Sequence, residues 1–418
     1  MTHDLKSQSP ASALIDRSDV RVKHEQGLAG ALRSFLVRVR SGDLGSLPVV
    51  VGLIIIWTVF SSLNPIFLSS SNLVNLLFDC STTGVISLGI VCILMVGEID
   101  LSVGSVSGFA SAMIGVLWVN HGIPVGFAIM AAIAVGAMIG AIYAFLFNQL
   151  SMPSFVSSLS GLLAILGLQL YVLPKGSINL PYGSHMVDFG QTLVMPHTVS
   201  YILAALPGIL YFLAGYRSST RRRQARLSVQ PIGGLVARAA AMVAILEVIA
   251  LYLNQARGIP WMFGLFVGLV ILMNYALTRT KWGRSMSAVG GNREAARRSG
   301  INVRLIYTSA FMLCSSFAAL GGVLAASRLA SASQQAGTGD VNLNAIAAAV
   351  IGGTSLFGGR GSAYSALLGI IVIQSISSGL TLIDLSSSLR YMITGGVLAI
   401  AVIVDSLARR SRVSHGRA

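Results

Sequence analysis

The stretch PVGFAIMAAIAVGAMIGAIYAFLFN, residues 124–148, contains no charged side chain. As an α-helix, with a rise of about 1.5 Å per residue, it would be long enough to cross the hydrocarbon core of a bilayer, which is about 30 Å thick. A helix also satisfies its backbone hydrogen bonds internally, as a segment in lipid must. This stretch therefore predicts a transmembrane helix.

Similar apolar runs recur along the chain of 418 residues, which is 54% hydrophobic and 10% charged, with a mean hydropathy of +0.77. Soluble domains carry about 25% charged residues. The candidate spans are residues 47–66, 74–97, 102–119, 124–148, 154–173, 199–216, 235–254, 259–278, 305–326, 344–357, 362–381 and 388–407. We therefore predict an all-α, polytopic transmembrane helical bundle of about 12 spans (range 10–14), with some helices short or broken. A polar break at residues 72–81 leaves open whether the second run is split.

The charge of the chain is +15, and its distribution indicates the topology. Lys and Arg collect in the cytoplasmic loops of membrane proteins. With the N-terminus inside and twelve alternating spans, 25 of the 29 Lys and Arg residues lie on the cytoplasmic side. The exceptions are Lys175, Arg257, Arg328 and Arg390. This asymmetry predicts that both termini are cytoplasmic, and it explains the basic charge by topology, without nucleic-acid binding.

The residue inventory gives no indication of an enzyme, a metal site or a cofactor. Cys80, Cys92 and Cys314 all lie in apolar runs, and the six histidines form no HExxH motif. No lysine follows a glycine, so the phosphate-binding GK[ST] loop of many ATPases is missing. We expect no catalytic residues and no bound ATP by that route.

The chain divides into a cytoplasmic N-terminal tail at 1–46, a transmembrane domain at 47–408 and a basic cytoplasmic tail at 409–418. The first long apolar run begins only after the polar tail, which is not typical of a signal peptide. Within the tail, Leu28, Leu32, Phe35, Leu36 and Val39 share one helical face, which favours an interfacial helix. A disordered tail is an equally good interpretation.

Two glycine-containing segments interrupt apolar runs. In the first, at residues 96–105, Glu98 and Asp100 are costly at membrane depth unless they are solvated or paired, and Asp100 and Ser102 can cap the next helix. A capped turn without a ligand is the simpler interpretation. The second segment, residues 351–362, is loosely similar, and paired Gly-interrupted segments suggest a repeated transporter architecture. The candidates for the translocation pathway or gate are Glu98, Asp100, Ser102, Gly352, Gly353 and Ser355.

Two further acids, Asp79 and Glu247, lie deeper in apolar runs. An acid in a membrane span is a candidate functional group. For Asp79, near polar Asn75 and Ser81, a hydrogen bond within the bundle is the favoured interpretation. Glu247 could belong to a proton relay, which would suit a secondary transporter, although we predict that it is structural.

Small residues spaced by four predict close helix contacts in lipid. The pairs are Gly104 and Gly108, Gly136 and Gly140, and Gly264 and Gly268. Each pair is a weak signal alone.

The basic loop at 279–304 contains a short self-contained helix, Arg293–Ser299. Asn292 can cap its start, Glu294 suits the first turn, and Arg297 and Arg298 suit the last. Gly300 fits the left-handed residue that ends a helix. An ordinary basic loop is the alternative.

Three motifs together, GEIDLSVGS at 97–105, GGNREAARRSGI at 290–301 and GGTSLFGGRGS at 352–362, resemble the permease subunits of bacterial ABC importers for ribose, arabinose, galactose and xylose. The resemblance runs from about residue 48 to 408. It implies that the chain forms a translocation channel in the inner membrane, as a homodimer. It also implies two partners, a cytoplasmic ABC ATPase subunit and a periplasmic sugar-binding protein. It also implies that the helix near residue 293 couples to the ATPase. The coupling residues would be Asn292, Arg293, Glu294, Ala295, Ala296, Arg297 and Gly300, with Ala295 and Ala296 on the flank that seats in the ATPase.

The region 174–258 holds two apolar runs and an Arg-rich loop. The resemblance implies that these are additions to the shorter layout of the ribose-type permeases. An added pair of spans keeps the C-terminus inside. This longer layout resembles the xylose-type permeases and suggests D-xylose or another pentose as the substrate. A branched-chain amino-acid permease, an ion-gradient-driven transporter and a membrane scaffold without transport remain alternatives.

Overall fold

The computed structural model describes residues 47–390 except 175, 226, 228, 230, 231 and 387, together with residues 392–396, 399 and 403. The N-terminal tail with its predicted interfacial helix, the basic tail at 409–418 and half of the last predicted span lie outside the described residues. Within them the protein is almost entirely helical, and nine helices are long and apolar enough to cross a membrane. The predicted polytopic helical fold is confirmed.

The helices follow the apolar runs in order. They are α2 (Leu47–Leu63), α3 (Ser70–Met95), α4 (Val103–Ile114) continued by the π-helix η3 (Gly115–Asn120), α5 (Val125–Leu150), α6 (Ser154–Val172), α7 (His185–Gln191), α8 (His197–Gln224), α9 (Ile232–Asn254), α10 (Trp261–Arg279), α11 (Lys281–Gly291), α12 (Arg293–Arg298), α13 (Val303–Leu329), α14 (Val341–Ile351) and α15 (Ala363–Leu382). The first eleven predicted spans each coincide with one of these elements. The polar break at 72–81 does not split α3, because its polar side chains find partners on other helices.

The chain forms two compact units, and one of them contains α8 and α9, within residues 195–258. The two helices pack closely because Gly208 and Gly215 of α8 leave room for Val243 and Leu235 of α9. The remaining described elements form the second, larger unit. Within this larger unit, the residues just before α8 and just after α9 meet. Val194 and Pro260 form an antiparallel bridge, and the Trp261 amide donates to the Leu193 carbonyl at 3.3 Å.

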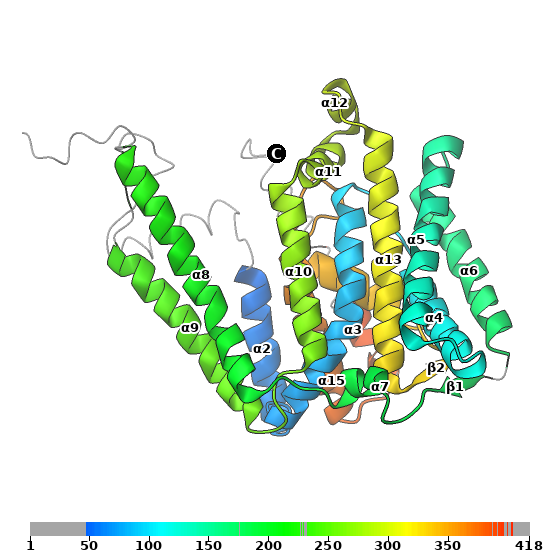
Figure 1. Cartoon of the computed structure of the whole chain (residues 1–418), viewed down its shortest axis with the longest axis horizontal. Coiled ribbons are helices and arrows are strands. Elements are labelled where there is room, and N and C mark those ends of the chain that lie inside the picture. Colours follow the sequence, from blue (N-terminus) through cyan, green and yellow to red (C-terminus); the bar gives the residue numbers. More distant parts are fainter. Residues whose placement is uncertain are drawn as a thin grey trace, which may run out of the picture. The chain divides into compact units, whose positions relative to one another are not determined.

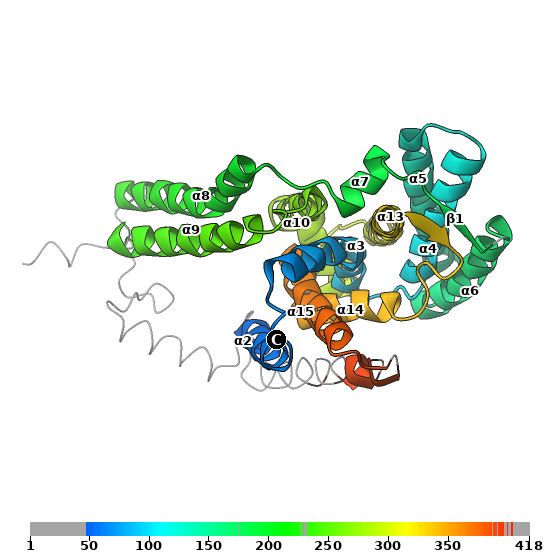
Figure 2. The ribbon, with the colours of Figure 1, turned by 90° about the horizontal axis from the view of Figure 1, so that it is seen from below.

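The larger unit is built around α3 and α13. Seen from below in Figure 2, α3 lies among α10, α13, α14 and α15, all of which pack on it. Helix α13 also packs along α5, and the glycines predicted for close contacts explain how. A Cβ on Gly136 would lie 2.7 Å from the carbonyl oxygen of Ser315, and one on Gly140 would lie 2.6 Å from the Cα of Met312.

The other glycine pairs behave differently from each other. Gly104 and Gly108 of α4 pack closely on the backbone of residues 336–337, which lie in the loop between β2 and α14, so the contact is close but its partner is not the predicted helix. Gly268 of α10 has no atom within 4 Å of the place a Cβ would take, and the prediction is wrong for that residue. A spacing of four therefore does not by itself place a glycine against another part of the protein.

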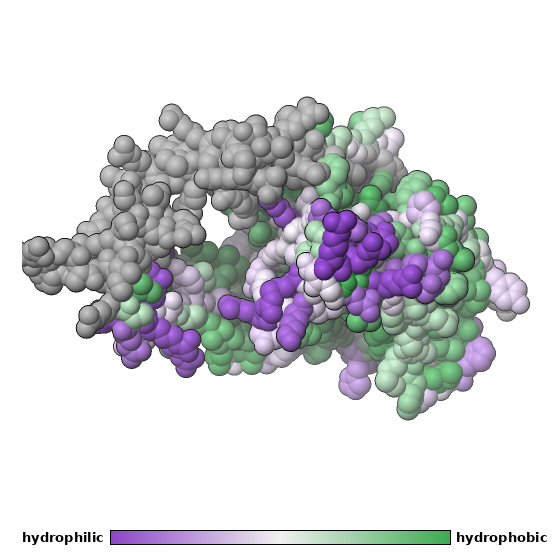
Figure 3. All heavy atoms as spheres, turned by 90° about the horizontal axis from the view of Figure 1, so that it is seen from above, coloured by the Kyte–Doolittle hydropathy of each residue, from purple (hydrophilic) through white to green (hydrophobic). Residues whose placement is uncertain are grey.

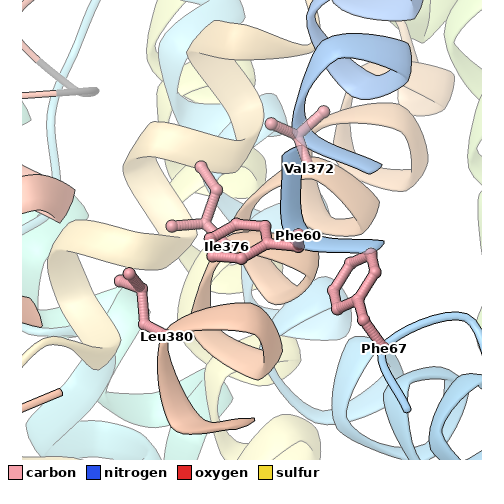
Figure 4. Close-up of a cluster of buried hydrophobic side chains, with 5 residues drawn as sticks. All are labelled: Phe60, Phe67, Val372, Ile376 and Leu380. Atoms are coloured by element: carbon pink, nitrogen blue, oxygen red, sulfur yellow. The ribbon is translucent and has the colours of Figure 1, made fainter. Parts of the chain in front are cut away.

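The first helix is anchored to the last described span by aromatic packing. Figure 4 shows Phe60 and Phe67 beside Val372, Ile376 and Leu380 of α15. The Trp57 indole nitrogen of α2 also donates to the Ser375 hydroxyl of α15 at 2.9 Å.

The two ends of the larger unit differ in structure. Figure 1 shows α11 and α12 at one end, and α7 with strands β1 (Ser177–Asn179) and β2 (Ser331–Ser333) at the other. The strands pair antiparallel, Ser177 opposite Ser333, and so tie the chain after α6 to the chain after α13. Viewed from the α12 end, hydrophilic residues gather over α11 and α12, and the surrounding helices show mostly hydrophobic surface (Figure 3).

Candidate functional site

The predicted short helix is present as α12, Arg293–Arg298. The Asn292 side-chain oxygen accepts a hydrogen bond from the Ala295 amide at 2.9 Å, and Gly300 has a φ of +81°. Glu294 accepts from Arg297 at 3.0 Å and from Arg298 at 3.2 Å. The predicted caps are confirmed, and both ion pairs are exposed, so each contributes little to stability.

The orientation of α12 corrects one expectation. Ala296 was predicted to lie on the flank that seats in a partner, but its side chain is 4% exposed and faces the protein's own interior. Ala295, on the next position, is exposed. A six-residue helix is not stable alone in water, so it must rest on the rest of the bundle, and Ala296 is the small apolar residue on which it rests.

Arg293 holds the start of α12 against two transmembrane helices. Its guanidinium carbon lies 5.7 Å from the ring centroid of Phe147 on α5 and 5.3 Å from that of Tyr307 on α13. The two rings contact each other with centroids 4.7 Å apart. A guanidinium within about 6 Å of an aromatic face is attracted to it. Arg293 therefore connects α12 directly to α5 and α13.

Arg293 also acts on Glu98, a predicted gate residue. Glu98 is partly buried and accepts a hydrogen bond at 2.5 Å from the Ser154 hydroxyl at the start of α6. Burial raises the pKa of Glu98, whereas the Ser154 hydrogen bond and the charge of Arg293 oppose that rise. Glu98 is thus linked electrostatically to the helix predicted for coupling.

Glycines bring the three sequence motifs to one place. Gly290 precedes α12, and a Cβ on it would overlap with the Met95 carbonyl at the end of α3. A Cβ on Gly358 would lie 2.8 Å from the Gly290 carbonyl oxygen and 2.9 Å from the Gly97 Cα. The Gly359 amide donates to the Met95 carbonyl at 2.9 Å. We call Gly97, Gly290 and Gly358 the glycine junction. Backbone therefore packs directly against backbone where the motifs at 97–105, 290–301 and 352–362 meet.

Asp100 lies two residues before Ser102, the residue that precedes α4. Its side chain is fully buried, and one carboxylate oxygen accepts from the Ser102 amide at 2.8 Å and from the Ser102 hydroxyl at 2.7 Å. Ser102 occupies the N-cap position of α4, but its side chain makes no capping bond, which corrects the expectation that it caps the helix. Its hydroxyl is turned to Asp100 because a buried carboxylate needs donors.

The second gate segment forms the turn between α14 and α15. Gly352 ends α14 and packs on Ser365, Gly353 has a φ of +106°, and the Ser355 amide donates to the Arg360 carbonyl at 3.0 Å. This turn reaches the junction through Gly358. The starts of the two short helices also meet, since the Gly104 amide of α4 donates to the Asn342 side chain of α14. The structure thus links Glu98 to α12 through Arg293, places Gly352, Gly353 and Ser355 in the turn that reaches the glycine junction through Gly358, and places Asp100 and Ser102 just before α4.

The two intramembrane acids have different surroundings. Asp79 forms an ion pair at 2.9 Å with Arg328 of α13, so it is bonded within the bundle as favoured. Glu247 is half-buried in α9. The sequence analysis did not select Arg328, Ser154, Phe147 or Tyr307, since nothing in their local sequence indicates which distant residues they contact.

Comparison with known proteins identifies the family. Residues 72–402 match the family described as the branched-chain amino acid transport system / permease component. The chain belongs to this permease family. It is 34% identical to the xylose transport system permease protein XylH of Escherichia coli strain K12 over 345 residues, which cover 82% of this chain and 87% of XylH.

Other permeases align over similar lengths. The ribose import permease protein RbsC of E. coli strain K12 is 28% identical over 363 residues, which cover 85% of this chain and 92% of RbsC. The probable ABC transporter permease protein YphD of the same strain is 30% identical over 382 residues, or 91% of this chain and 94% of YphD. No solved structure matches the chain. The resemblance to sugar permeases that include the xylose type is confirmed, and these relatives are transport subunits.

Proposed function

We propose that the protein is the permease subunit of an ATP-binding-cassette importer and forms the translocation pathway for a monosaccharide, D-xylose or another pentose. Its similarity to XylH over most of both chains supports the choice of sugar. As a multi-pass protein of the bacterial inner membrane, it would keep both termini in the cytoplasm, as the distribution of Lys and Arg suggests.

Three partners complete the proposed transporter. A separate cytoplasmic ATPase subunit supplies the energy, a periplasmic sugar-binding protein delivers the substrate, and a second copy of the permease completes the channel. On the cytoplasmic side, the exposed face of α12, including Asn292, Glu294, Ala295 and Arg297, docks on the ATPase. The gate segments at 97–105 and 352–362 belong to the proposed translocation pathway.

One observation carries this proposal: the contacts of α12 lead directly to the gate segments. Arg293 ties α12 to α5, α13 and Glu98, and Gly290 packs on the end of α3 and on Gly358. Movement of an ATPase that holds α12 would therefore displace the gate segments through the Arg293 side chain and through the backbone contacts of Gly290. A membrane scaffold would have no need for this linkage.

Uptake in a strain lacking the gene tests the proposal. Plasmid-borne permease should restore uptake of a radiolabelled pentose, and depletion of ATP should abolish that uptake. An uncoupler applied with ATP maintained should leave it intact. The opposite response to these two treatments would identify an ion-gradient-driven transporter. Restored leucine uptake without pentose uptake would identify an amino-acid permease.

A further inference from the structure

A stripe of polar side chains runs along the first half of α3. Asn72, Asn75, Asp79 and Thr82 are spaced by three, four and three residues, so they share one face of the helix. All four are partly exposed, whereas the second half of α3, from Gly84 to Met95, is buried throughout. We call this face, together with the side chains that join it from α13 and α15, the polar face.

Helix α15 contributes two of these side chains. The Gln374 amide nitrogen donates to the Asp79 backbone carbonyl at 3.1 Å. The Ser378 hydroxyl donates to the Asn72 side-chain oxygen at 3.2 Å. Both are partly exposed, so the polar face continues from α3 onto α15.

Helix α13 contributes Arg328. Its guanidinium donates to the Asp79 carboxylate at 2.9 Å and to the Asn75 side-chain oxygen at 3.5 Å. The guanidinium carbon also lies 5.0 Å from the Phe78 ring centroid. Arg328 is thereby held in one orientation, and it cancels the charge of Asp79.

The exposure of Asp79 shows that the pair does more than join two helices. The Asp79 side chain, in the first half of α3, is 46% exposed, and that of Arg328, in the last turn of α13, is 20% exposed. A carboxylate is very costly toward lipid, so this surface must face water or protein. Surfaces of this unit that suit lipid look different: α5 exposes Phe127, Ile142 and Phe145.

We propose that the polar face lines the route along which the transported sugar crosses the membrane. The inference rests on the proposed function and deepens it by naming surface residues of the pathway. The chemistry fits a neutral polyhydroxylated solute. Carboxamides, hydroxyls and a carboxylate can exchange hydrogen bonds with sugar hydroxyls, and the neutralised Asp79–Arg328 pair creates little net field that would collect ions.

Cysteine accessibility tests the inference without requiring transport. Cys80, Cys92 and Cys314 are fully buried, so the background reaction of the native protein with a charged, hydrophilic methanethiosulfonate should be low. In membranes containing the complete transporter, Asn75→Cys and Thr82→Cys should react. Ile142→Cys, which is 49% exposed on α5, is the lipid-facing control and should not react. Excess D-xylose should slow the reaction of Asn75→Cys at least twofold.

Each result has a definite meaning. If Asn75→Cys and Thr82→Cys react only after denaturation, the face is sealed and the inference is wrong. If Asn75→Cys resists the reagent but forms a disulfide with the same residue of a second copy, the face is a contact between permeases, which also overturns it. Reaction of both variants in a transporter that carries no pentose would uphold the aqueous route and refute only the sugar named under the proposed function.

Discussion

The guanidinium of Arg293 lies 5.3 Å from the ring centroid of Tyr307, and this contact joins the short helix α12 to the transmembrane helix α13. Arg293→Ala should leave insertion normal and lower ATP-driven uptake several-fold, because α12 loses exposed cation–π contacts of about 0.5–1 kcal/mol that fix its position. Uptake normalised to permease abundance is the measurement. Arg304→Ala, at an exposed arginine near the start of α13, is the control. Equal uptake by both variants would contradict the role given to Arg293.

Neighbouring alanines of α12 should respond differently to the same change. Ala295→Glu places a charge on the exposed face, so the permease should accumulate normally but recover less of the ATPase subunit when it is purified through a tag. Ala296→Glu buries a charge, which costs several kcal/mol, so the permease itself should be depleted from the membrane. Normal abundance of the Ala296 variant would show that the orientation of α12 is wrong.

Adjacent glycines provide a matched pair at the glycine junction. Gly290→Ala introduces a methyl group where the Met95 carbonyl lies, and it should destabilise the protein by about 1–3 kcal/mol. Gly291→Ala meets no atom within 4 Å and should change stability little. Thermal unfolding of the detergent-solubilised protein distinguishes them. A lower Tm for Gly291→Ala than for Gly290→Ala would refute the packing described for the junction.

Reporter fusions test the topology around α8 and α9. An enzyme active only in the periplasm should be active when fused at His185, and one active only in the cytoplasm when fused at Ser219. The expected pattern follows from the Arg-rich end of α8, where Arg221, Arg222 and Arg223 lie in the last turn. The reverse pattern would overturn the orientation of this region.

A substitution at Glu247 distinguishes ATP-driven transport from transport that uses a proton relay. Glu247→Gln keeps the size of the side chain and removes its charge, so ATP-driven uptake should remain within about twofold of the wild type, since no proton needs to pass. Uptake is compared with membrane abundance in the same cells. A variant that inserts normally and transports nothing would support proton-coupled transport.

Much of the fold follows from hydropathy alone. Eleven of the twelve predicted spans coincide with described elements. A bilayer requires long apolar helices, and the hydropathy of each segment is enough to reveal such a helix. The caps of α12 were equally local, since Asn292 bonds to an amide three residues away. The continuity of α3 through its polar break was left open, because it depends on Gln374 and Ser378, which are distant in sequence.

The orientation of functional side chains required the tertiary structure. Ala295 and Ala296 are identical in sequence terms, and only the contact of α12 with the bundle separates the exposed one from the buried one. Asp79 and Arg328 are 249 residues apart in the sequence. The sequence analysis placed Arg328 only among the basic residues outside the cytoplasmic loops and gave it no partner. Motif recognition selected the three segments of the glycine junction, but their meeting at Gly97, Gly290 and Gly358 became visible only in three dimensions.

The bridge between Val194 and Pro260 places the two ends of the α8–α9 excursion side by side. A short linker could therefore replace residues 195–258 without rethreading the rest of the bundle, and an even number of crossings would be lost. The helical pair is consequently a separable part of the architecture, because its removal would leave the connectivity of the larger unit unchanged. The same junction offers protein engineers a natural point at which to graft a rigid marker for imaging.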